Sequence, residues 1–259
     1  MKKNILFLII GMIIMGGISA IAYQFSAKDI SYTPSNSNWK VSNVKEAIDD
    51  IKMSGTTKKV CTLKSGDALT IGSMYECDPG DGVKRNFYVL EVRSDSVDLI
   101  MDRNITQGSG TTTMTWNNAM KYIDNNNLKS SWKDVNNVDL PKAQAIANAV
   151  GNSSWKAVDN SSWWCLASHK QDSQSAPFCN TEQAKAYNWL YDYTRECNGC
   201  SHNLGSTEAY GYWTRDLISG ASNAWNVSRH GALDYNAVSD ATYDGVRPVI
   251  TLSKSNLSN

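Results

Sequence analysis

The chain opens with an apolar run after a short basic start. Lys2 and Lys3 precede a stretch from Ile5 to Ala22 that carries no charge. This length lies where signal peptides and membrane anchors overlap. The sequence Ala20-Ile21-Ala22 offers a small-x-small cleavage site, whereas an uncleaved run would remain as an anchor with its lysines in the cytoplasm. Residues 1–22 therefore predict a signal peptide or an anchor, and both place the remainder outside the cell.

A polar segment without periodicity comes next, followed by a short amphipathic stretch. Residues 23–42 are rich in Ser, Asn and Thr and predict a linker. Residues 43–55 predict a helix, with Asn43 and Glu46 at the spacing of a capping box and Gly55 as the stop. This helix is too short to be stable alone. We expect it either to dock on its own domain or to self-associate as a stalk through Val44, Ala47, Ile48 and Ile51.

Residues 56–259 predict one α+β domain whose strands are clearest at its two ends. The apolar positions of residues 87–92 and 97–101 predict two strands, and residues 93–96 predict the turn of a hairpin between them. The apolar segment 245–252 predicts a strand that closes the chain.

Between these strands the spacing of apolar residues predicts helices. One covers residues 116–123, and a second covers 140–150, with Pro141 in its first turn and Gly151 as its stop. Residues 183–195 predict a third, shorter helix.

The segment from 151 to 248 has a different texture, rich in Ser, Asn, Gly, Asp and Trp. Short strands are predicted over 163–167, 209–213 and 224–227. So long a polar region cannot be free coil inside a domain. We expect it to be held by its cysteines and by core tryptophans, namely Trp164, Trp213 and Trp225.

Composition changes this picture in two ways. Lys and Arg number 25 and Asp and Glu number 25, so the formal net charge is zero. Nucleic-acid-binding proteins usually carry a basic excess, so we expect no nucleic-acid partner. Nine Trp and twelve Tyr stand against four Phe. Rings with a polar group suit an interface as well as a core.

The even number of cysteines agrees with export, because exported chains use cysteine mainly in disulfides. Cys61 and Cys77 are close in sequence and isolated from the rest, and we predict that they pair. The second group leaves three connectivities open among Cys165, Cys179, Cys197 and Cys200.

Two alternatives would use these cysteines differently. Cys197-x-x-Cys200 is half of a usual zinc pattern, and His169 and His202 lie nearby in the sequence. Cys165 with His169 would be a nucleophile and its base. The disulfide interpretation is favoured over both.

Three segments carry a resemblance to known proteins. They are the hairpin that ends in Leu-Ile-Met-Asp-Arg-Asn-Ile (99–105), the string Tyr-Trp-Thr-Arg (212–215) and Gly-Val-Arg-Pro-Val-Ile-Thr-Leu (245–252). Over residues 60–254 the chain resembles a family of bacterial exported proteins. Their C-terminal part is similar to C-type-lectin-like domains and to the formylglycine-generating-enzyme fold. The resemblance implies that the N- and C-terminal strands pair, with a long irregular loop region between them carrying the binding surface.

The resemblance is incomplete where calcium-dependent lectins bind sugar. Those lectins use Glu-Pro-Asn or Gln-Pro-Asp together with Trp-Asn-Asp, and the nearest strings here are Trp116-Asn117-Asn118 and Trp225-Asn226-Val227. Calcium-mediated sugar binding is therefore not implied, and the resemblance lends a fold rather than an activity.

Two groups of side chains are the candidate ligand contacts. The aromatic residues that we assign to a binding surface are Trp163, Tyr235 and Tyr243. A cluster of oxygen-bearing side chains that would suit Ca²⁺ consists of Asp234, Asn236, Asp240 and Asp244. Its spacing is not that of an EF-hand, and a solvated loop is the alternative interpretation. Arg247 is expected to hold loop carbonyls by hydrogen bonds.

We therefore expect an exported binding module, secreted or displayed at the outer face of the membrane, that recognises a glycan or a protein. We expect no enzymatic activity, and Ca²⁺ is the one cofactor considered. The membrane would be contacted only through the N-terminal segment. One alternative is a structural subunit of an appendage or fibre, assembled through residues 43–53. The other is a formylglycine-generating-type enzyme with free thiols at Cys197 and Cys200.

Overall fold

The computed structural model separates into two compact units, residues 1–58 and residues 59–259. Across the part of the chain that the structure describes, no helix is long and apolar enough to cross a membrane. The predicted export segment 1–22 lies outside that part. The structure describes residues 30, 31, 33, 42–48, 58–105, 113–124, 128–157, 164–169, 179, 186–191, 211–218, 222–228 and 231–258.

Of the amphipathic helix predicted over 43–55, the structure describes residues 43–48. Residues 44–48 are helical, and Asn43 caps them by accepting the backbone N–H of Glu46 at 2.8 Å. The Glu46 carboxylate accepts the backbone N–H and the hydroxyl of Ser42, at 2.8 and 2.7 Å, which lowers the pKa of Glu46. The return bond thus goes to Ser42, one residue earlier than a capping box requires. Ile48 is 42% exposed.

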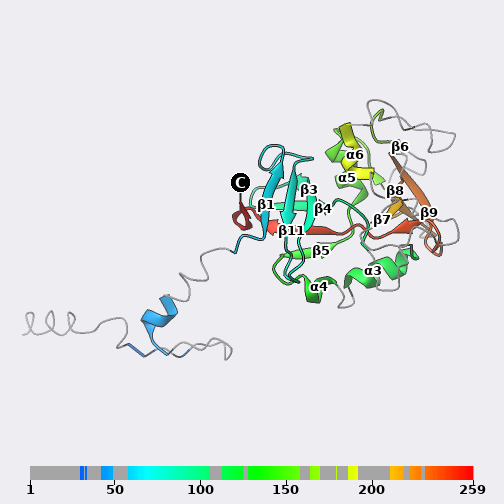
Figure 1. Cartoon of the computed structure of the whole chain (residues 1–259). Coiled ribbons are helices and arrows are strands. Elements are labelled where there is room, and N and C mark those ends of the chain that lie inside the picture. The colour runs from blue at the N-terminus through cyan, green and yellow to red at the C-terminus, as the bar shows by residue number, and fades with distance from the viewer. Residues whose placement is uncertain are drawn as a thin grey trace, which may run out of the picture. The chain divides into compact units, whose positions relative to one another are not determined.

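The second unit is a mixed α+β domain made mostly of sheet (Figure 1). Its major sheet has the strand order β12-β1-β2-β3-β4-β11-β5. All neighbouring strands are antiparallel except β1 and β12, which run parallel. The strands are β1 (Cys61–Ser65), β2 (Met74–Cys77), β3 (Arg85–Val92), β4 (Ser96–Met101), β5 (Asn137–Asp139), β11 (Val249–Ser253) and β12 (Leu257–Ser258).

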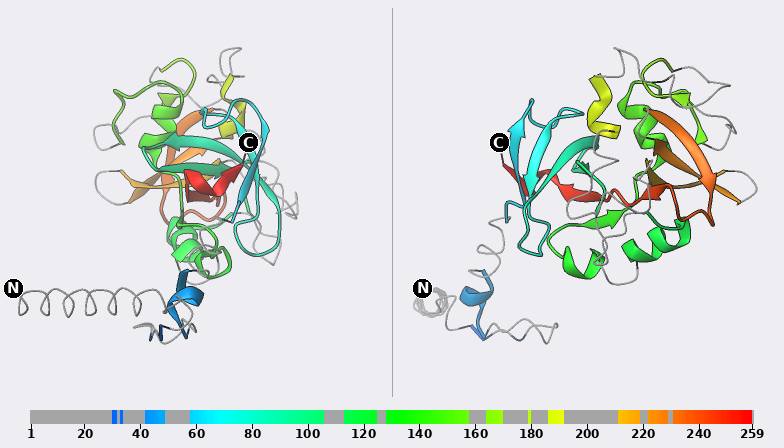
Figure 2. Two further views of the ribbon diagram at one scale, coloured as in Figure 1. Left: turned by 90° about the vertical axis from the view of Figure 1, so that its left-hand side faces the viewer. Right: turned by 45° about the vertical axis from the view of Figure 1, so that its right-hand side comes forward.

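A second sheet has the order β10-β7-β8-β9-β6. Its strands are β6 (Trp164–Cys165), β7 (Gly211–Leu217), β8 (Asn223–Ser228), β9 (Ala232–Ala237) and β10 (Asp244–Gly245). The chain passes from β10 to β11 through only Val246, Arg247 and Pro248. The closing segment, red in Figure 2, therefore links the two sheets directly.

The helices are short and differ partly from prediction. They are α3 (Trp116–Asp124), α4 (Leu128–Ser131), α5 (Ala143–Ala149) and α6 (Asn188–Tyr191), with a 3-10 turn η4 (Lys254–Asn256). The expectation that Pro141 lies in the first turn of α5 is wrong, because the helix begins after Lys142. The backbone N–H of Ala143 donates to the Asp216 carboxylate at 2.6 Å, so a distant side chain caps α5.

Two hydrophobic cores flank the second sheet. One contains Phe87, Leu99 and Ile250 of the major sheet together with Trp213. The other core contains residues of α5 and α6 packed against side chains from both sheets, and Trp225 is one of its members. The predictions that Trp213 and Trp225 are buried are confirmed, whereas Trp164 is only partly buried. The strands β7 and β8 thus bury side chains on both faces, with Trp213 and Ala224 in the first core and Tyr212 and Trp225 in the second.

The predicted hairpin is confirmed as β3 and β4, and β11 pairs with β4 through Ile250 and Leu99. The predicted closing strand is shorter than expected, because residues 246–248 form the link between the sheets. Of the predicted helix 183–195, residues 188–191 form α6 and most of the rest lie outside the described residues.

Two disulfides lie within the described residues of the domain. Cys61 and Cys77 are joined, as predicted, at opposing positions of β1 and β2. Cys165 is joined to Cys179, which is one of the three connectivities that the sequence left open. Cys197 and Cys200 lie outside the described residues.

Candidate functional site

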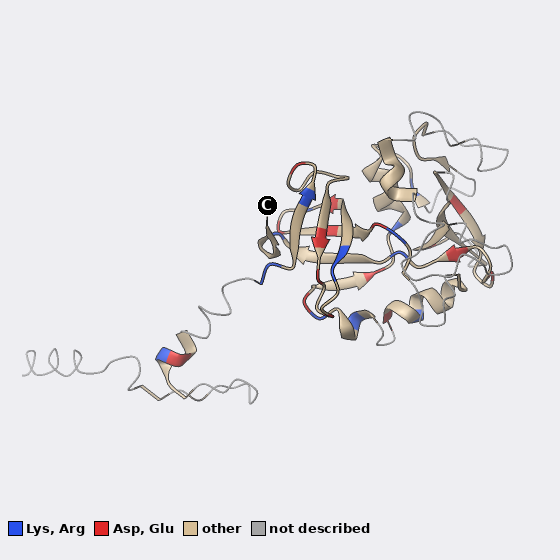
Figure 3. Ribbon diagram, in the orientation of Figure 1, with Lys and Arg blue, Asp and Glu red and all other residues tan. Residues whose placement is uncertain are grey.

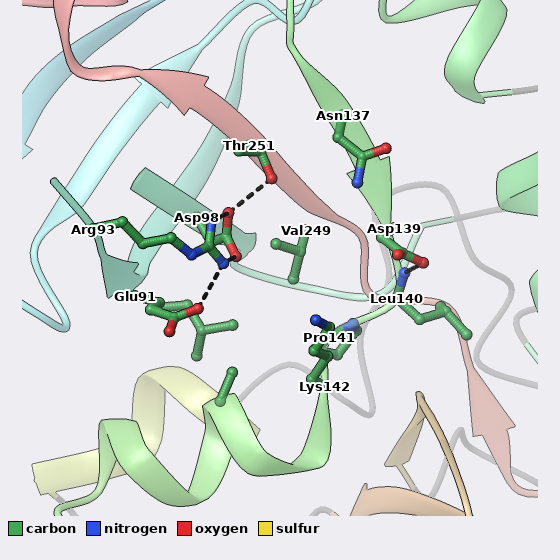
Figure 4. Close-up of a pocket in the computed structure, with 12 residues that line it drawn as sticks. Glu91, Arg93, Asp98, Asn137, Asp139, Leu140, Pro141, Lys142, Val249 and Thr251 are labelled. Atoms are coloured by element: carbon green, nitrogen blue, oxygen red, sulfur yellow. Dashed lines mark hydrogen bonds and ion pairs between the residues drawn. The ribbon is translucent and has the colours of Figure 1, made fainter. Parts of the chain in front are cut away.

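A pocket of about 340 Å³ lies where α5 meets the major sheet (Figure 4). We call it the α5 pocket. Its apolar lining comes from Leu90, Val249, Leu140, Pro141 and Ala145. Its polar lining consists of Glu91, Arg93, Asp98, Asn137, Asp139, Lys142 and Thr251.

One wall of the pocket is a fixed network of charges from β3, β4 and β11. Arg93 donates to both oxygens of Asp98 and also to Glu91, at 2.6 Å for the latter. These bonds raise the pKa of Arg93, with the hydrogen bond to Asp98 as the main cause. Thr251 donates its hydroxyl to Asp98 at 2.7 Å. The two carboxylates and the guanidinium are therefore held in place without a ligand (Figure 4).

The opposite wall carries two polar side chains that are not hydrogen-bonded to each other. Asn137 projects from β5, and Lys142 stands at the start of α5. In the described part of the chain, neither side chain makes a hydrogen bond or an ion pair. Asp139, between them in sequence, is held by Arg215 and by the backbone N–H of Leu140 at 2.8 Å.

The lining offers both apolar contacts and hydrogen-bond donors to a ligand. Seven of the twelve lining residues are polar or charged, which is more polar than the usual small-ligand site, and the volume is at the lower end of the range for such sites. The ammonium of Lys142 and the carboxamide of Asn137 can both donate to a hydroxyl or a carboxylate. None of these residues was foreseen from sequence, because β5 and β11 pair across more than a hundred residues.

The predicted calcium cluster comes together only in part. The buried carboxylate of Asp244 accepts the carboxamide N–H groups of Asn226 and Asn236, at 3.0 and 2.6 Å. Burial raises the pKa of Asp244 to about 7, and Asp234 and Asp240 contribute to the rise as like charges. Burial also raises the pKa of Asp234 to about 6. Asp234 and Asp240 accept bonds from their own chain neighbours, Tyr235 and Thr242.

Three oxygens near this cluster lack hydrogen-bond partners within the described structure. They are Asn226 Oδ1, Ser228 Oγ and Asp244 Oδ1, each fully buried. Asn226 was not predicted; it faces Asp244 because β10 pairs with β7, next to β8. No group of three or more His, Cys, Asp or Glu side chains within the described residues is arranged to hold a metal ion. A cation here would need amide and hydroxyl oxygens as ligands.

The structure describes two of the three predicted aromatic contacts. Tyr243 is 44% exposed, whereas Tyr235 is half-buried with its ring edge-to-face against Trp225. Trp163 lies outside the described residues.

The alternative cysteine chemistry is not available to Cys165 and Cys179. Their disulfide leaves no thiolate for zinc or for nucleophilic attack. The ring Nε2 of His169 lies 2.7 Å from the carbonyl of Val150 instead of facing a thiol. The disulfide interpretation of Cys165, which the sequence favoured over a Cys165–His169 nucleophile, is confirmed.

Arg247 has the structural role that was predicted. It is fully buried, donates to the carbonyls of Leu190 and Asp102, and stacks 5.0 Å from the ring of Tyr212. It joins the end of β4, α6 and β7 at the link between the two sheets. Comparison of the chain with protein-family models, with curated proteins and with solved structures finds no match.

Proposed function

We propose that this chain is an exported binding module that recognises a glycan or a protein. The ligand binds in the α5 pocket, and the protein catalyses no reaction there. The observation that carries the proposal is the pair of walls in Figure 4. One wall is rigid before any ligand arrives, and the other offers the uncommitted side chains of Asn137 and Lys142. Polar groups held in place lose little freedom on binding, which favours recognition.

We also propose that the second unit has a C-type-lectin-like fold. A C-type-lectin-like arrangement accounts for the parallel pairing of β1 with β12 and for β11 beside the β3–β4 hairpin. It accounts equally for the long segment between α5 and β7. The two disulfides are of the kind that oxidising compartments allow, and they support a location outside the cell.

The test is a glycan and peptide array probed with the full chain. We expect a defined set of ligands whose signal falls about tenfold in Lys142→Ala and in Asn137→Ala, a loss of one charge-assisted or neutral hydrogen bond in a partly dry site. Lys133→Ala, an exposed residue outside the pocket lining, is the matched control. Tyr243→Ala and Trp163→Ala test the aromatic surface predicted from sequence. Equal binding by all variants would show that the α5 pocket is not the binding site. Equal signals from all glycans and peptides on the array would contradict the proposed class of ligand.

A second proposal concerns calcium, and the three buried oxygens without partners favour it. Two carboxylates with raised pKa values and no described cationic partner near them suit a cation ligated by Asp244, Asn226 and Ser228. Bound Ca²⁺ would replace the proton of Asp244 at neutral pH. The melting temperature of the full chain at pH 7.5 should then rise with millimolar Ca²⁺, and Asp244→Asn should abolish the rise. An identical melting temperature with Ca²⁺ and with a chelator would exclude this site.

The alternatives have their own supports and tests. The exposed Ile48 supports assembly through residues 43–53, and a fibre subunit would form oligomers that disappear when this segment is deleted. An enzyme of the formylglycine-generating type would show free thiols at Cys197 and Cys200. A thiol count of zero under denaturing, non-reducing conditions would exclude the enzyme.

A further inference from the structure

We infer that the α5 pocket binds an uncharged sugar chain, which lies across the strands of the major sheet. The inference rests on the proposed function, and it chooses the glycan where that function leaves a glycan or a protein open. Three features of the pocket support it. They are a row of polar side chains across four strands, a near balance of charge, and open hydrogen-bond donors and acceptors in the same lining.

The row takes one polar side chain from each of four neighbouring strands. Glu91 of β3 is opposite Asp98 of β4, and Asp98 is opposite Thr251 of β11. On its other side Thr251 is opposite Asn137 of β5. All four residues line the pocket. Adjacent strands are about 4.8 Å apart, so the row is about 14 Å long, which exceeds the length of a single sugar ring.

An apolar row lies beside the polar one, two residues further along β4 and β11. Ile100 is opposite Val249, and both are buried in the same core as Ala145 of α5. Val249 and Ala145 also line the pocket, so its surface is polar on one side and apolar on the other. A sugar ring has hydroxyl groups around its edge and C–H groups on its faces, so it can contact both rows.

The charges of the site nearly cancel. Each lining carboxylate is already paired with a guanidinium group, from Arg93 or from Arg215. Lys142 lies near Asp216, whose pKa burial raises and the charge of Lys142 lowers. Figure 3 likewise shows basic and acidic positions interspersed over the major sheet. The full set is four carboxylates, Glu91, Asp98, Asp139 and Asp216, against three cations, Arg93, Lys142 and Arg215.

This balance disfavours an ionic ligand of either sign. An anion would find one cation without an ion pair in the described structure, Lys142, and would meet the carboxylates beside it. A cation would have to compete with Arg93 and Arg215 for carboxylates that they already hold. The lining therefore favours a ligand that forms hydrogen bonds and carries no charge.

The open groups of the lining include both donors and acceptors. The Asn137 carboxamide can donate and accept, and the Lys142 ammonium can only donate. Glu91 binds Arg93 through Oε2 at 2.6 Å, and its Oε1 accepts no bond from a described residue. A hydroxyl group both donates and accepts hydrogen bonds. A sugar can therefore match all three groups, whichever way each one is oriented.

A peptide suits the same lining less well. Extended peptides bind sheets by pairing their backbone with an edge strand, and other peptides insert apolar side chains into apolar pockets. The α5 pocket lies over β3, β4 and β11, whose backbones are paired with strands on both sides. Seven of its twelve lining residues are polar or charged, which leaves few contacts for an apolar anchor.

The experiment measures binding of the full chain to soluble hexasaccharides by titration calorimetry, at low and at high salt. The uncharged probes are maltohexaose, cellohexaose and N-acetylchitohexaose. The charged probes are hexagalacturonate, an anion, and the chitosan hexamer, a cationic form of the chitohexaose chain. We expect an uncharged probe to bind, with an affinity that changes less than about twofold with salt, because it forms no charge pair. The corresponding monosaccharide should bind at least about tenfold more weakly, because it leaves part of the row without hydrogen bonds.

Paired variants separate hydrogen bonding from charge. Lys142→Gln keeps a donor and removes the charge, so it should weaken binding about threefold, whereas Lys142→Met removes the donor and should weaken it about tenfold. Asn137→Leu should also weaken it about tenfold. Both positions are exposed, so these changes leave the core intact. Lys133→Met, outside the pocket lining, makes the matched change at another exposed lysine.

The outcomes separate this inference from the proposed function. Binding through the α5 pocket of charged hexasaccharides alone, or of peptides alone on the array, would overturn the inference and keep the proposed function. Equal losses in Lys142→Gln and Lys142→Met would also overturn it, because the charge rather than the donor would then matter. Failure of every uncharged probe to bind would overturn it as well. Binding that Lys142→Met and Asn137→Leu leave unchanged would place the ligand outside the α5 pocket and overturn both.

Discussion

The major sheet and the second sheet bury side chains by different means. In the major sheet, buried apolar residues such as Phe87, Val89 and Leu99 form the interior, and charged groups lie at the surface in pairs. In the second sheet, polar residues are buried among the apolar ones, including Thr214, Asn226 and Asp244. The first region is stabilised mainly by apolar burial, and the second depends in addition on hydrogen bonds to particular partners.

The second sheet is tied to its surroundings by side chains that reach backbone carbonyls of distant segments. The indole N–H of Trp213 donates to Met114 at 2.7 Å, and that of Trp116 donates to Thr214 at 2.9 Å. Asn104 donates to the carbonyl of Gly211 at 3.0 Å. Gly211 is required there, because a Cβ would lie 2.3 Å from the carbonyl oxygen of Val227. Such anchors tie β7 to segments that lie outside its own sheet.

The largest expected effect tests apolar burial in the major sheet. Phe87 is fully buried with its ring edge-to-face against Trp132 at 6.1 Å. Phe87→Ala should lower the free energy of unfolding by about 4 kcal/mol, from lost transfer energy and the remaining cavity. Chemical denaturation of the full chain measures it. A loss below about 1 kcal/mol, the size of a surface change, would contradict the role given to this core.

The next effect belongs to the second sheet and depends on pH. Burial raises the pKa of Asp244 to about 7, so the folded state binds a proton more tightly than the unfolded state. The stabilisation is fully present below the unfolded value near 4 and is lost as pH rises through about 7. Asp244→Asn cannot ionise, so in the absence of Ca²⁺ it should exceed the wild type in stability above pH 7.5 by an amount on the order of 3 kcal/mol.

The control for that prediction lies in the major sheet. Asp95 is exposed in the turn between β3 and β4, and Asp95→Asn makes the same change of charge. Melting temperatures between pH 4 and pH 8 should follow the wild type in this variant and lose most of the downward slope in Asp244→Asn. A parallel slope in all three proteins would show that Asp244 does not differ from a surface carboxyl.

The same contrast explains which parts of the fold could be read from the sequence. Alternation of apolar residues predicted β3 and β4, and local spacing predicted the pair Cys61 and Cys77. The strands β1 and β2 were missed because β1 has only one buried residue, Cys61, and β2 has four residues in all. The strand β9 was missed because it carries Asp234, Tyr235 and Asn236 rather than an apolar stripe.

The candidate sites were harder to predict than the fold, for a related reason. Asn137 and Lys142 become a pocket wall only because β5 pairs with β11, and Asn226 meets Asp244 only through β7 and β8. No spacing within the sequence signals these neighbours. Of the predicted cluster of Asp234, Asn236, Asp240 and Asp244, the side chains of Asn236 and Asp244 are hydrogen-bonded to each other, whereas the Asp234 and Asp240 side chains accept bonds from neighbouring residues.

A smaller effect compares two buried tyrosines, one in each region. The hydroxyl of Tyr212 donates to the Leu190 carbonyl at 2.7 Å beside Arg247, and burial raises the pKa of Tyr212 to about 12. The hydroxyl of Tyr75 only accepts the Leu69 backbone N–H at 3.2 Å. Tyr212→Phe should cost about 2 kcal/mol and Tyr75→Phe about half of that, because the first loses the shorter hydrogen bond, made in a fully buried site, and leaves the buried Leu190 carbonyl with one donor fewer. Equal costs in denaturation would end the contrast between the regions.

The smallest effect is at the surface of the major sheet, where Arg93 joins Asp98 and Glu91. The Arg93 side chain is 41% exposed, so water and salt screen the pair. Arg93→Gln should cost at most about 1 kcal/mol at low salt and nothing measurable at 1 M salt. A cost that persists at high salt would mean that the network stabilises the major sheet as the polar anchors stabilise the second sheet. A cost that disappears at high salt would mean that the network contributes little to stability. Its proposed role is then to hold the Asp98 and Glu91 carboxylates in place for a ligand of the α5 pocket.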